Sequence, residues 1–438
     1  MLLSGNGKVT DKIIVDAVKQ FRSPFYLYDE SVILEKANTV LSMPNAYGLN
    51  VSYAMKANSN KAILQLLHNQ GFKIDASSLN EARRAFLAGI PLNKIMLTTQ
   101  EIPLDNERRD LEQMVMNGLK YNVCSLRQLQ LISDFAAKHQ ISLAMRVHPG
   151  VGTGESVTRN TGDKYSCFGV HLTDIEKALQ YAKTKAIKFD IVHTHIGSGG
   201  SPEEWRNNIE RELGFVEQYF PDATIVNFGG GFKEARMPDE SASDIHELGL
   251  YAKNRFEEFY EKTGRKLTME VEPGTYMMAN AGYLVSTVLD IKQTGSDGFE
   301  FMILDGGMES NARPLLYGSR HPFYVVSQKG QLLSSEFELN GFDKEKDSRV
   351  IVGRCCESGD SQCLDETGNI VPRVMAKPAI GDFVAIGGAG AYCSSMSPYN
   401  YNSYVQAPEI LLRTNGHMRV IREPQTLQQM IENELPLE

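Results

Sequence analysis

Short apolar runs alternate with longer amphipathic stretches over residues 51–272. Eight runs rich in β-branched and aromatic side chains predict strands, at 51–56, 73–76, 95–99, 121–124, 143–148, 189–195, 224–228 and 267–272. Several stretches between them, such as 60–71 and 77–89, open on Ser or Asn and close on Gly, as capped helices do. Eight strand–helix units in about 220 residues predict a closed (βα)8 barrel of the TIM type rather than an open sheet.

The pattern changes after residue 296 to short, strand-like pieces separated by Gly turns, at 299–307, 323–328, 349–354 and 382–388. These pieces predict a second, mainly antiparallel β domain. The N-terminal PFYLYD is also strand-like, so we expect it to pair with that sheet. The predicted domains are therefore 1–33 as a segment joining the β domain, 34–296 as the barrel, and 297–438 as the β domain.

Charge and composition narrow the classes of partner. The net charge of −9 argues against nucleic acid or an anionic membrane, since both select a basic surface. The N-terminus has neither a basic lead nor a long apolar run, so no signal peptide or membrane anchor is expected. Six cysteines without a repeated C-x-x-C pair disfavour a disulfide scaffold and a zinc module. The expected location is the cytoplasm.

In a barrel of this kind, reactive groups collect at the carboxyl ends of the strands. Polar residues stand at or beside these predicted ends: Lys56, Asp75, Arg146, His148, His195 and Glu272, with Gly229, Gly230 and Gly231 just after the seventh strand.

Two of these features can be interpreted either as functional groups or as ordinary structural ones. Partial burial of Lys56 would lower the pKa of its amine and make it nucleophilic toward an aldehyde, or Lys56 merely reaches solvent. Gly229–Gly231 leaves backbone N–H groups open to a phosphate, or forms a simple tight turn. A second Gly-rich stretch, 149–156, lacks the spacing of a nucleotide loop and is interpreted as a flexible loop.

The sixth predicted strand carries His193 and His195 on one face, followed by Ser198 in a loop. Ser198 could donate to a phosphate. His195 could stack on a flat cofactor ring, be a hydrogen-bonded core residue, or bind zinc with His148, His193 and Glu272.

Glu272, at the end of the eighth predicted strand, could hold a pyridinium nitrogen protonated, which makes the ring a strong electron sink suited to decarboxylation. The plain interpretation is an ion pair with a neighbouring base.

The predicted β domain adds a second group of candidates. Cys356 and Glu357 lie in a Gly-flanked loop as a possible proton donor beside a carboxylate, although adjacent cysteines are more often inert. Arg313 and Tyr317 are suited to clamping a carboxylate, and the hydroxyl of Tyr392 to reaching a phosphate.

The order of these motifs resembles the group III pyridoxal-5'-phosphate decarboxylases, which have an alanine-racemase-like fold, and among them the diaminopimelate decarboxylases. The resemblance covers nearly the whole chain and rests on YAMKAN, DASS (75–78), HIGSG (195–199), GGGF (229–232), EPG (272–274), CESGD (356–360), GAY and YN (401–402). It implies pyridoxal 5'-phosphate as cofactor, an amino acid substrate, and a homodimer whose active sites form at the interface.

The resemblance also implies roles for residues. Lys56 is similar to the Schiff-base lysine, Glu272 to the partner of the pyridine nitrogen and His195 to the residue stacked on the ring. The positions implied to bind the cofactor also include Asp75, Arg146, Ser198, Gly229, Gly230, Gly231, Gly274, Thr275 and Tyr392. Cys356 matches the proton donor from the other subunit, and Arg313, Tyr317, Glu357 and Tyr392 match substrate contacts.

The implied reaction is decarboxylation of meso-2,6-diaminopimelate to L-lysine, the last step of lysine biosynthesis. Thr275 stands where the family usually has Arg, which leaves a decarboxylase of ornithine, lysine or a D-amino acid as an alternative; Arg320 is a candidate replacement cation. A racemase, a metal hydrolase built on the histidines, and a catalytically silent pyridoxal-phosphate-binding paralogue are the further alternatives.

Overall fold

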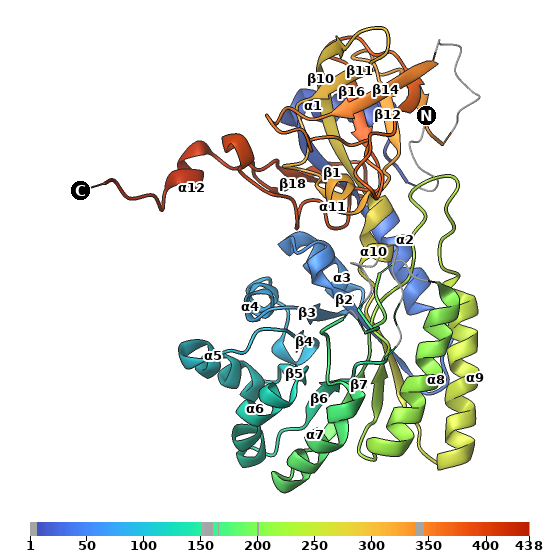
Figure 1. The fold of residues 1–438 in the computed structure, drawn as a ribbon, viewed down its shortest axis with the longest axis vertical. Helices are drawn as coiled ribbons and strands as arrows, with labels where there is room; N and C mark the ends of the chain where they lie inside the picture. The colour runs from blue at the N-terminus through green and yellow to red at the C-terminus, as the bar shows by residue number, and fades with distance from the viewer. Residues whose placement is uncertain are drawn as a thin grey trace. The chain divides into compact units, whose positions relative to one another are not determined.

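The structure is a computed structural model that describes residues 7–150, 152, 161–164, 166–198, 201–337 and 346–437 (Figure 1). The chain divides into two compact units. The barrel unit comprises residues 36–234 and 242–276, and the β unit comprises residues 1–35, 235–241 and 277–438. Most of the Gly-rich stretch 149–156 lies outside the described residues.

The barrel unit is built on eight parallel strands that close on themselves in chain order, from β2 to β9, with β2 paired to β9. The strands are β2 (Leu49–Ala54), β3 (Lys73–Ala76), β4 (Ile95–Thr98), β5 (Lys120–Val123), β6 (Leu143–Arg146), β7 (Phe189–His193), β8 (Ile225–Asn227) and β9 (Thr268–Val271). Each overlaps one of the eight predicted runs, so the predicted barrel is confirmed.

Helices alternate with the strands and surround the barrel (Figure 1). They are α3 (Lys61–Asn69), α4 (Leu79–Leu87), α5 (Asp105–Met116), α6 (Leu126–Lys138), α7 (Leu172–Thr184), α8 (Pro202–Tyr219), α9 (Ile245–Thr263) and the short α10 (Thr275–Met278), with 3₁₀ turns η1 (Met55–Ala57) and η2 (Leu92–Lys94). The side chains of Asn60, Ser78 and Ser125 accept backbone N–H groups at the starts of α3, α4 and α6, which confirms the predicted caps. Helix α2 (Glu30–Leu41) carries the chain from the β unit into the barrel unit.

The β unit contains one ten-stranded sheet and three short helices. Its strands are β1 (Phe25–Asp29), β10 (Gly282–Gln293), β11 (Glu300–Leu304), β12 (Phe323–Val326), β13 (Leu332–Ser335), β14 (Lys346–Val352), β15 (Arg373–Ala376), β16 (Phe383–Ile386), β17 (Glu409–Leu412) and β18 (Met418–Arg422). The helices are α1 (Asp11–Phe21), α11 (Arg313–Tyr317) and α12 (Leu427–Ile431), with 3₁₀ turns η4 (Ala279–Ala281) and η5 (Tyr401–Ser403). The order β13-β12-β16-β10-β1-β17-β18 forms the main path, and β11, β14 and β15 branch from β10.

The N-terminal strand β1 lies inside this sheet. It pairs antiparallel with β10 and parallel with β17, as expected for PFYLYD. All five of its residues are buried, and Phe25 and Leu27 join residues of α1 and β10 in the core of the unit. Apolar burial on this scale is the main force that holds the N-terminal segment in place.

The division between the units differs from the predicted boundary at residue 296. Strand β10 falls before that boundary, yet it pairs with β1, β11 and β16 and belongs to the β unit. Residues 235–241 also belong to the β unit, although the residues on both sides of them in the sequence belong to the barrel unit. Hydrophobic periodicity predicts where a strand lies in the sequence, but it does not predict which sheet that strand joins. The sequence pattern alone could therefore not place this boundary.

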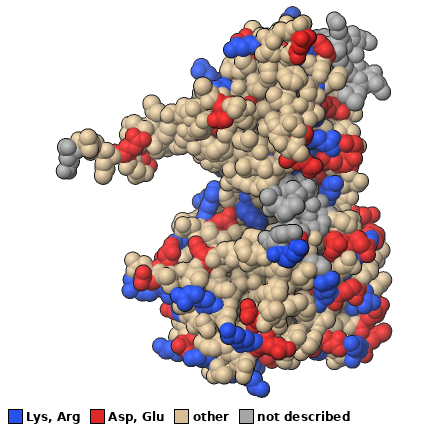
Figure 2. All heavy atoms as spheres, viewed as in Figure 1, with Lys and Arg blue, Asp and Glu red and all other residues tan. Residues whose placement is uncertain are grey.

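Charged side chains of both signs are interspersed over the face shown in Figure 2. No helix among the described residues is both long enough and apolar enough to cross a membrane. All six cysteines are free thiols.

Candidate active site

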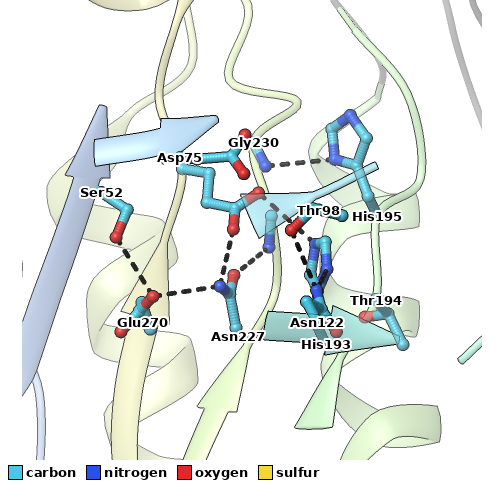
Figure 3. A network of polar contacts seen from close by, with 12 residues as sticks. Ser52, Asp75, Thr98, Asn122, His193, Thr194, His195, Asn227, Gly230 and Glu270 are labelled. Atoms are coloured by element: carbon cyan, nitrogen blue, oxygen red, sulfur yellow. Dashed lines mark hydrogen bonds and ion pairs between the residues drawn. The ribbon is translucent and has the colours of Figure 1, made fainter. Parts of the chain in front are cut away.

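Side chains from several strands converge inside the barrel unit near the carboxyl ends of those strands (Figure 3). They form a polar network that includes Asp75 on β3, Asn122 on β5, His193 on β7, Asn227 on β8 and Glu272 just after β9. The eight-strand closure explains this convergence, because parallel strands in a barrel present all their carboxyl ends at one rim.

Lys56 lies in the turn η1 directly after β2, and its side chain is 43% exposed. Its Nζ lies 3.7 Å from Oδ2 of Asp75. Burial, together with the negative charge of Glu272, raises the pKa of Asp75, whereas Lys56 lowers it in part. The second carboxyl oxygen of Asp75 is buried and has no hydrogen-bond partner among the described residues.

Glu272 is buried and is held from two sides. Its Oε1 accepts a hydrogen bond of 2.7 Å from Nδ2 of Asn227, and its Oε2 lies 3.4 Å from Nε2 of His193. Burial alone would raise the pKa of Glu272, but His193, and then Lys56, lower it below its usual value. The carboxyl group is therefore ionised at neutral pH.

The triple glycine follows β8 as a turn packed against these residues. A side chain on Gly230 would place its Cβ 2.6 Å from the carbonyl oxygen of Glu272, and Gly229 adopts a φ of +67°. The N–H groups of Gly229 and Gly230 donate to Oδ1 of Asn227 and Nδ1 of His195. Of the three glycines expected to face a phosphate, only Gly231 keeps an N–H group without a hydrogen bond among the described residues.

His195 follows β7, and its ring is neutral. Burial, with the positive charges of Arg146 and Lys56, lowers the pKa of His195 well below its usual value. Since Nδ1 accepts from the N–H of Gly230, the ring hydrogen is on Nε2.

Two further predicted site residues come from β6 and from the loop after β7. Arg146 is the last residue of β6, and its guanidinium packs over the ring of Phe168 at 4.9 Å. Ser198 is partly exposed in the loop after β7.

Among the described residues, His148, His193, His195 and Glu272 do not bring three ligand atoms within reach of a common ion, which disfavours the zinc alternative. The ring nitrogens of His148 contact the carbonyl of Asp163 at 3.0 Å and the N–H of Gly150 at 3.1 Å. In the described part of the chain, the one group with three ligand atoms close enough for a common ion is Glu309, Cys355 and Asp360, in the β unit.

The candidates of the β unit form two groups. The guanidinium of Arg313 lies 5.8 Å from the ring centres of both Tyr317 and Tyr392. In the exposed loop after β14, Cys356 donates its N–H to Oδ1 of Asn402, and Glu357 accepts a hydrogen bond from the hydroxyl of Tyr401.

The comparisons with known proteins agree with this geometry. A family model described as "Pyridoxal-dependent decarboxylase, pyridoxal binding domain" matches residues 33–279. The chain belongs to the pyridoxal-dependent decarboxylases. This pyridoxal-dependent decarboxylase is 30% identical over 439 residues to diaminopimelate decarboxylase of Escherichia coli K12, covering 99% of each chain.

Solved structures extend this similarity to the fold. A crystal structure of a diaminopimelate decarboxylase matches with a TM-score of 0.87 and 29% identity, covering 99% of both chains. That of the Helicobacter pylori enzyme, complexed with L-lysine, matches with a TM-score of 0.79 and 27% identity, covering 96% of this chain and 98% of that one.

The residues of this pyridoxal-dependent decarboxylase fit pyridoxal 5'-phosphate, the family's cofactor. The amine of Lys56 is accessible, and the carboxyl group of Glu272 is ionised. Asp75 keeps a buried oxygen without a partner, and a side chain on Gly230 would collide with backbone. An aldehyde, a ring nitrogen and a phosphate are the groups that such an amine, carboxylate and glycine turn bind.

Sequence reasoning missed three polar residues of the site. Asn122, Asn227 and Glu270 are fully or almost fully buried inside the barrel and bind other network members. The sequence does contain a signal for these three residues, because each is a polar residue within an otherwise apolar strand. Such a residue in a barrel strand needs a buried partner, which only the fold identifies.

Proposed function

We propose that this chain removes CO2 from meso-2,6-diaminopimelate and releases L-lysine. The full-length similarity to diaminopimelate decarboxylases supports this substrate. The observation that carries the chemistry is the ionised, buried carboxylate of Glu272 at the same barrel rim as the accessible amine of Lys56.

Bound pyridoxal 5'-phosphate supplies an electron sink for the electron pair left when CO2 departs. Lys56 would hold the cofactor covalently through Nζ until the substrate amine takes its place. Glu272 would keep a proton on the ring nitrogen through its ionised carboxylate. The neutral ring of His195 would lie against the cofactor ring, and Ser198, Gly231 of the glycine turn and Gly274 would hold its phosphate.

The β unit supplies the substrate contacts in this proposal. Arg313, Tyr317 and Glu357 bind the substrate, and Tyr392 helps to hold the phosphate. Cys356, from the second copy in a homodimer, donates a proton from Sγ to the carbon that has lost CO2. We place the enzyme in the cytoplasm.

The direct test is covalent trapping. Purified protein supplied with pyridoxal 5'-phosphate should absorb in the visible range, and borohydride should fix the cofactor onto the peptide that contains Lys56, as read by mass spectrometry. Lys56→Ala should abolish the fixed adduct and lower kcat by at least about 10³-fold, the scale expected when a covalent nucleophile is removed. A wild-type protein that is not labelled at residue 56 would contradict the assignment.

The substrate has one specific alternative. Thr275 has no guanidinium group. The guanidinium of Arg320 is paired with two carboxylates, 3.0 Å from Oδ1 of Asp239 and 3.4 Å from Oε1 of Glu240. Neither residue therefore offers an unpaired cation to the distal carboxylate of diaminopimelate. This favours a substrate without a second carboxylate, such as ornithine, lysine or a D-amino acid. CO2 release across meso-diaminopimelate, L-ornithine, L-lysine and D-lysine separates these substrates, and bound cofactor without turnover on any of them would favour the silent paralogue.

A further inference from the structure

His193 and Asn227 touch Glu272 but have no role in the chemistry described above. Both are almost completely buried, and both lie at the last positions of their strands, β7 and β8. The plain interpretation is that they only satisfy buried polar groups in the barrel interior. The directions of their hydrogen bonds point to a more specific role.

The orientation of the Asn227 amide is set by the glycine turn. The N–H of Gly229 can only donate, and it lies 2.8 Å from Oδ1 of Asn227. The amide nitrogen of Asn227 must therefore face the other way, toward Oε1 of Glu272 at 2.7 Å. Asn227 thus connects the glycine turn to the carboxylate through one rigid side chain (Figure 3).

The hydrogen on the His193 ring is placed by the carboxylate. Nε2 of His193 lies 3.4 Å from Oε2 of Glu272, and an ionised carboxylate can only accept, so Nε2 carries a hydrogen. Nδ1 on the other side of the ring lies 2.8 Å from the side-chain amide of Asn122. The amide of Asn122 is itself held by a 3.0 Å contact with Oγ1 of Thr98.

Oε1 of Glu272 therefore accepts a hydrogen bond from Asn227, and Oε2 lies beside the Nε2–H group of His193 at the longer distance of 3.4 Å. An N–H group beside a carboxylate stabilises the ionised form and makes the carboxylate a weaker base. A carboxylate that is a weaker base leaves a shared proton on its partner. In the proposed function, that partner is the ring nitrogen of the cofactor.

We propose that Asn227 and His193 are positioning residues that keep Glu272 ionised and in one rotamer, so that the proton stays on the cofactor's ring nitrogen. The inference rests on the proposed role of Glu272 in binding that nitrogen. It assigns the strength of the electron sink to a relay of four residues, Asn122, His193, Asn227 and Glu272, rather than to one carboxylate.

The test uses the holoenzyme loaded with pyridoxal 5'-phosphate that carries ¹⁵N in its ring, whose NMR shift reports protonation of that nitrogen. The variants are Asn227→Leu and His193→Leu, which remove each donor at similar volume. Both should move the ¹⁵N signal toward the unprotonated position. Each should also lower kcat by about 10- to 100-fold, the scale of a lost polar contact with a charged group, with a much smaller change in KM.

Two further variants separate positioning from a general loss of structure. His193→Gln keeps an N–H donor and should restore most of the signal and of kcat. Ser133→Ala is the matched control, because Ser133 is equally buried and its hydroxyl donates to the carbonyl of Leu129 within α6, away from Glu272 and its partners. It should leave the ¹⁵N signal unchanged.

The inference is overturned if the ¹⁵N signals of Asn227→Leu and His193→Leu coincide with that of the wild type, or if Ser133→Ala shifts the signal equally. Failure of the proposed function is visible separately, as a wild type that releases no CO2 from any tested amino acid. The NMR comparison needs bound cofactor but no turnover, so it decides the inference in that case as well.

Discussion

At the scale of single residues, the glycine turn after β8 shows how closely the backbone and the site are packed. A Cβ on Gly230 would lie 2.6 Å from the carbonyl oxygen of Glu272, and one on Gly229 would lie 2.5 Å from Nδ1 of His195. The sequence left two interpretations of these residues open, a phosphate cradle and a tight turn. In the structure, the N–H groups of Gly229 and Gly230 donate to Asn227 and His195.

Gly230→Ala should therefore shift the backbone of Glu272 and weaken cofactor binding. Overpacking of this kind costs about 1–3 kcal/mol of unfolding free energy. Gly214→Ala is the control, since Gly214 lies on α8 and a Cβ there meets nothing within 4 Å; a gain of about 0.4–1 kcal/mol is expected there. Urea unfolding and cofactor titration measure both effects, and equal cofactor affinity in the two variants would contradict the close packing.

At the scale of elements, α8 shows what a hydrophobic pattern leaves out. Its buried face carries Trp205, Asn208 and Glu212 at helical spacing, so two polar side chains point inward. Asn208 and Glu212 both bind the hydroxyl of Thr194, just after β7. Burial raises the pKa of Glu212 well above its usual value, so the folded protein holds this carboxyl protonated.

Glu212→Gln should stabilise the protein more at pH 8 than at pH 5. The unfolded chain releases the Glu212 proton above its ordinary pKa of 4.5, whereas the folded protein keeps it. Stability is thus greatest below that pH and falls as the pH rises toward the folded pKa, by up to about 1.4 kcal/mol per pH unit. Gln removes this loss.

Urea unfolding at the two pH values measures the difference. The control is Glu217→Gln on the same helix, where Glu217 pairs with Lys262 at the surface and should contribute under about 1 kcal/mol at either pH. A benefit of Glu212→Gln that does not grow with pH would show that Glu212 is ionised in the folded state.

At the scale of the whole molecule, each unit is assembled from distant parts of the chain. The β unit takes β1 from the N-terminus and β17 from near the C-terminus as neighbours in one sheet. The barrel unit holds Lys56 and Glu272, and the β unit holds Cys356 and Arg313. The proposed homodimer would complete each site with Cys356 of the second copy.

Mixing two inactive variants tests that proposal. Lys56→Ala and Cys356→Ala homodimers should each be nearly inactive. When they are dissociated and reassociated together, half of the dimers are hybrids, and each hybrid has one intact site, so about a quarter of wild-type activity should return. Activity that stays at the level of the separate variants would show that both residues act within one copy.

Much of the fold follows from the sequence alone. Period-two and period-3.6 patterns predicted the eight barrel strands, their capped helices and the strand-like N-terminus, because these patterns reflect which side chains each element buries. The same strand ends predicted Lys56, Asp75, His195 and Glu272 as site residues, since a barrel collects such ends at one rim.

Only the tertiary structure decided the rest. Three features depend on contacts between residues far apart in the chain. They are the membership of β10 in the β unit, the contact of the His148 ring with the carbonyl of Asp163, and the contact of Lys56 with Asp75. The donors around Glu272 could not be predicted either. A polar residue in a strand reveals that it needs a partner, and the direction of each hydrogen bond is set only when β5, β7, β8 and β9 are brought side by side.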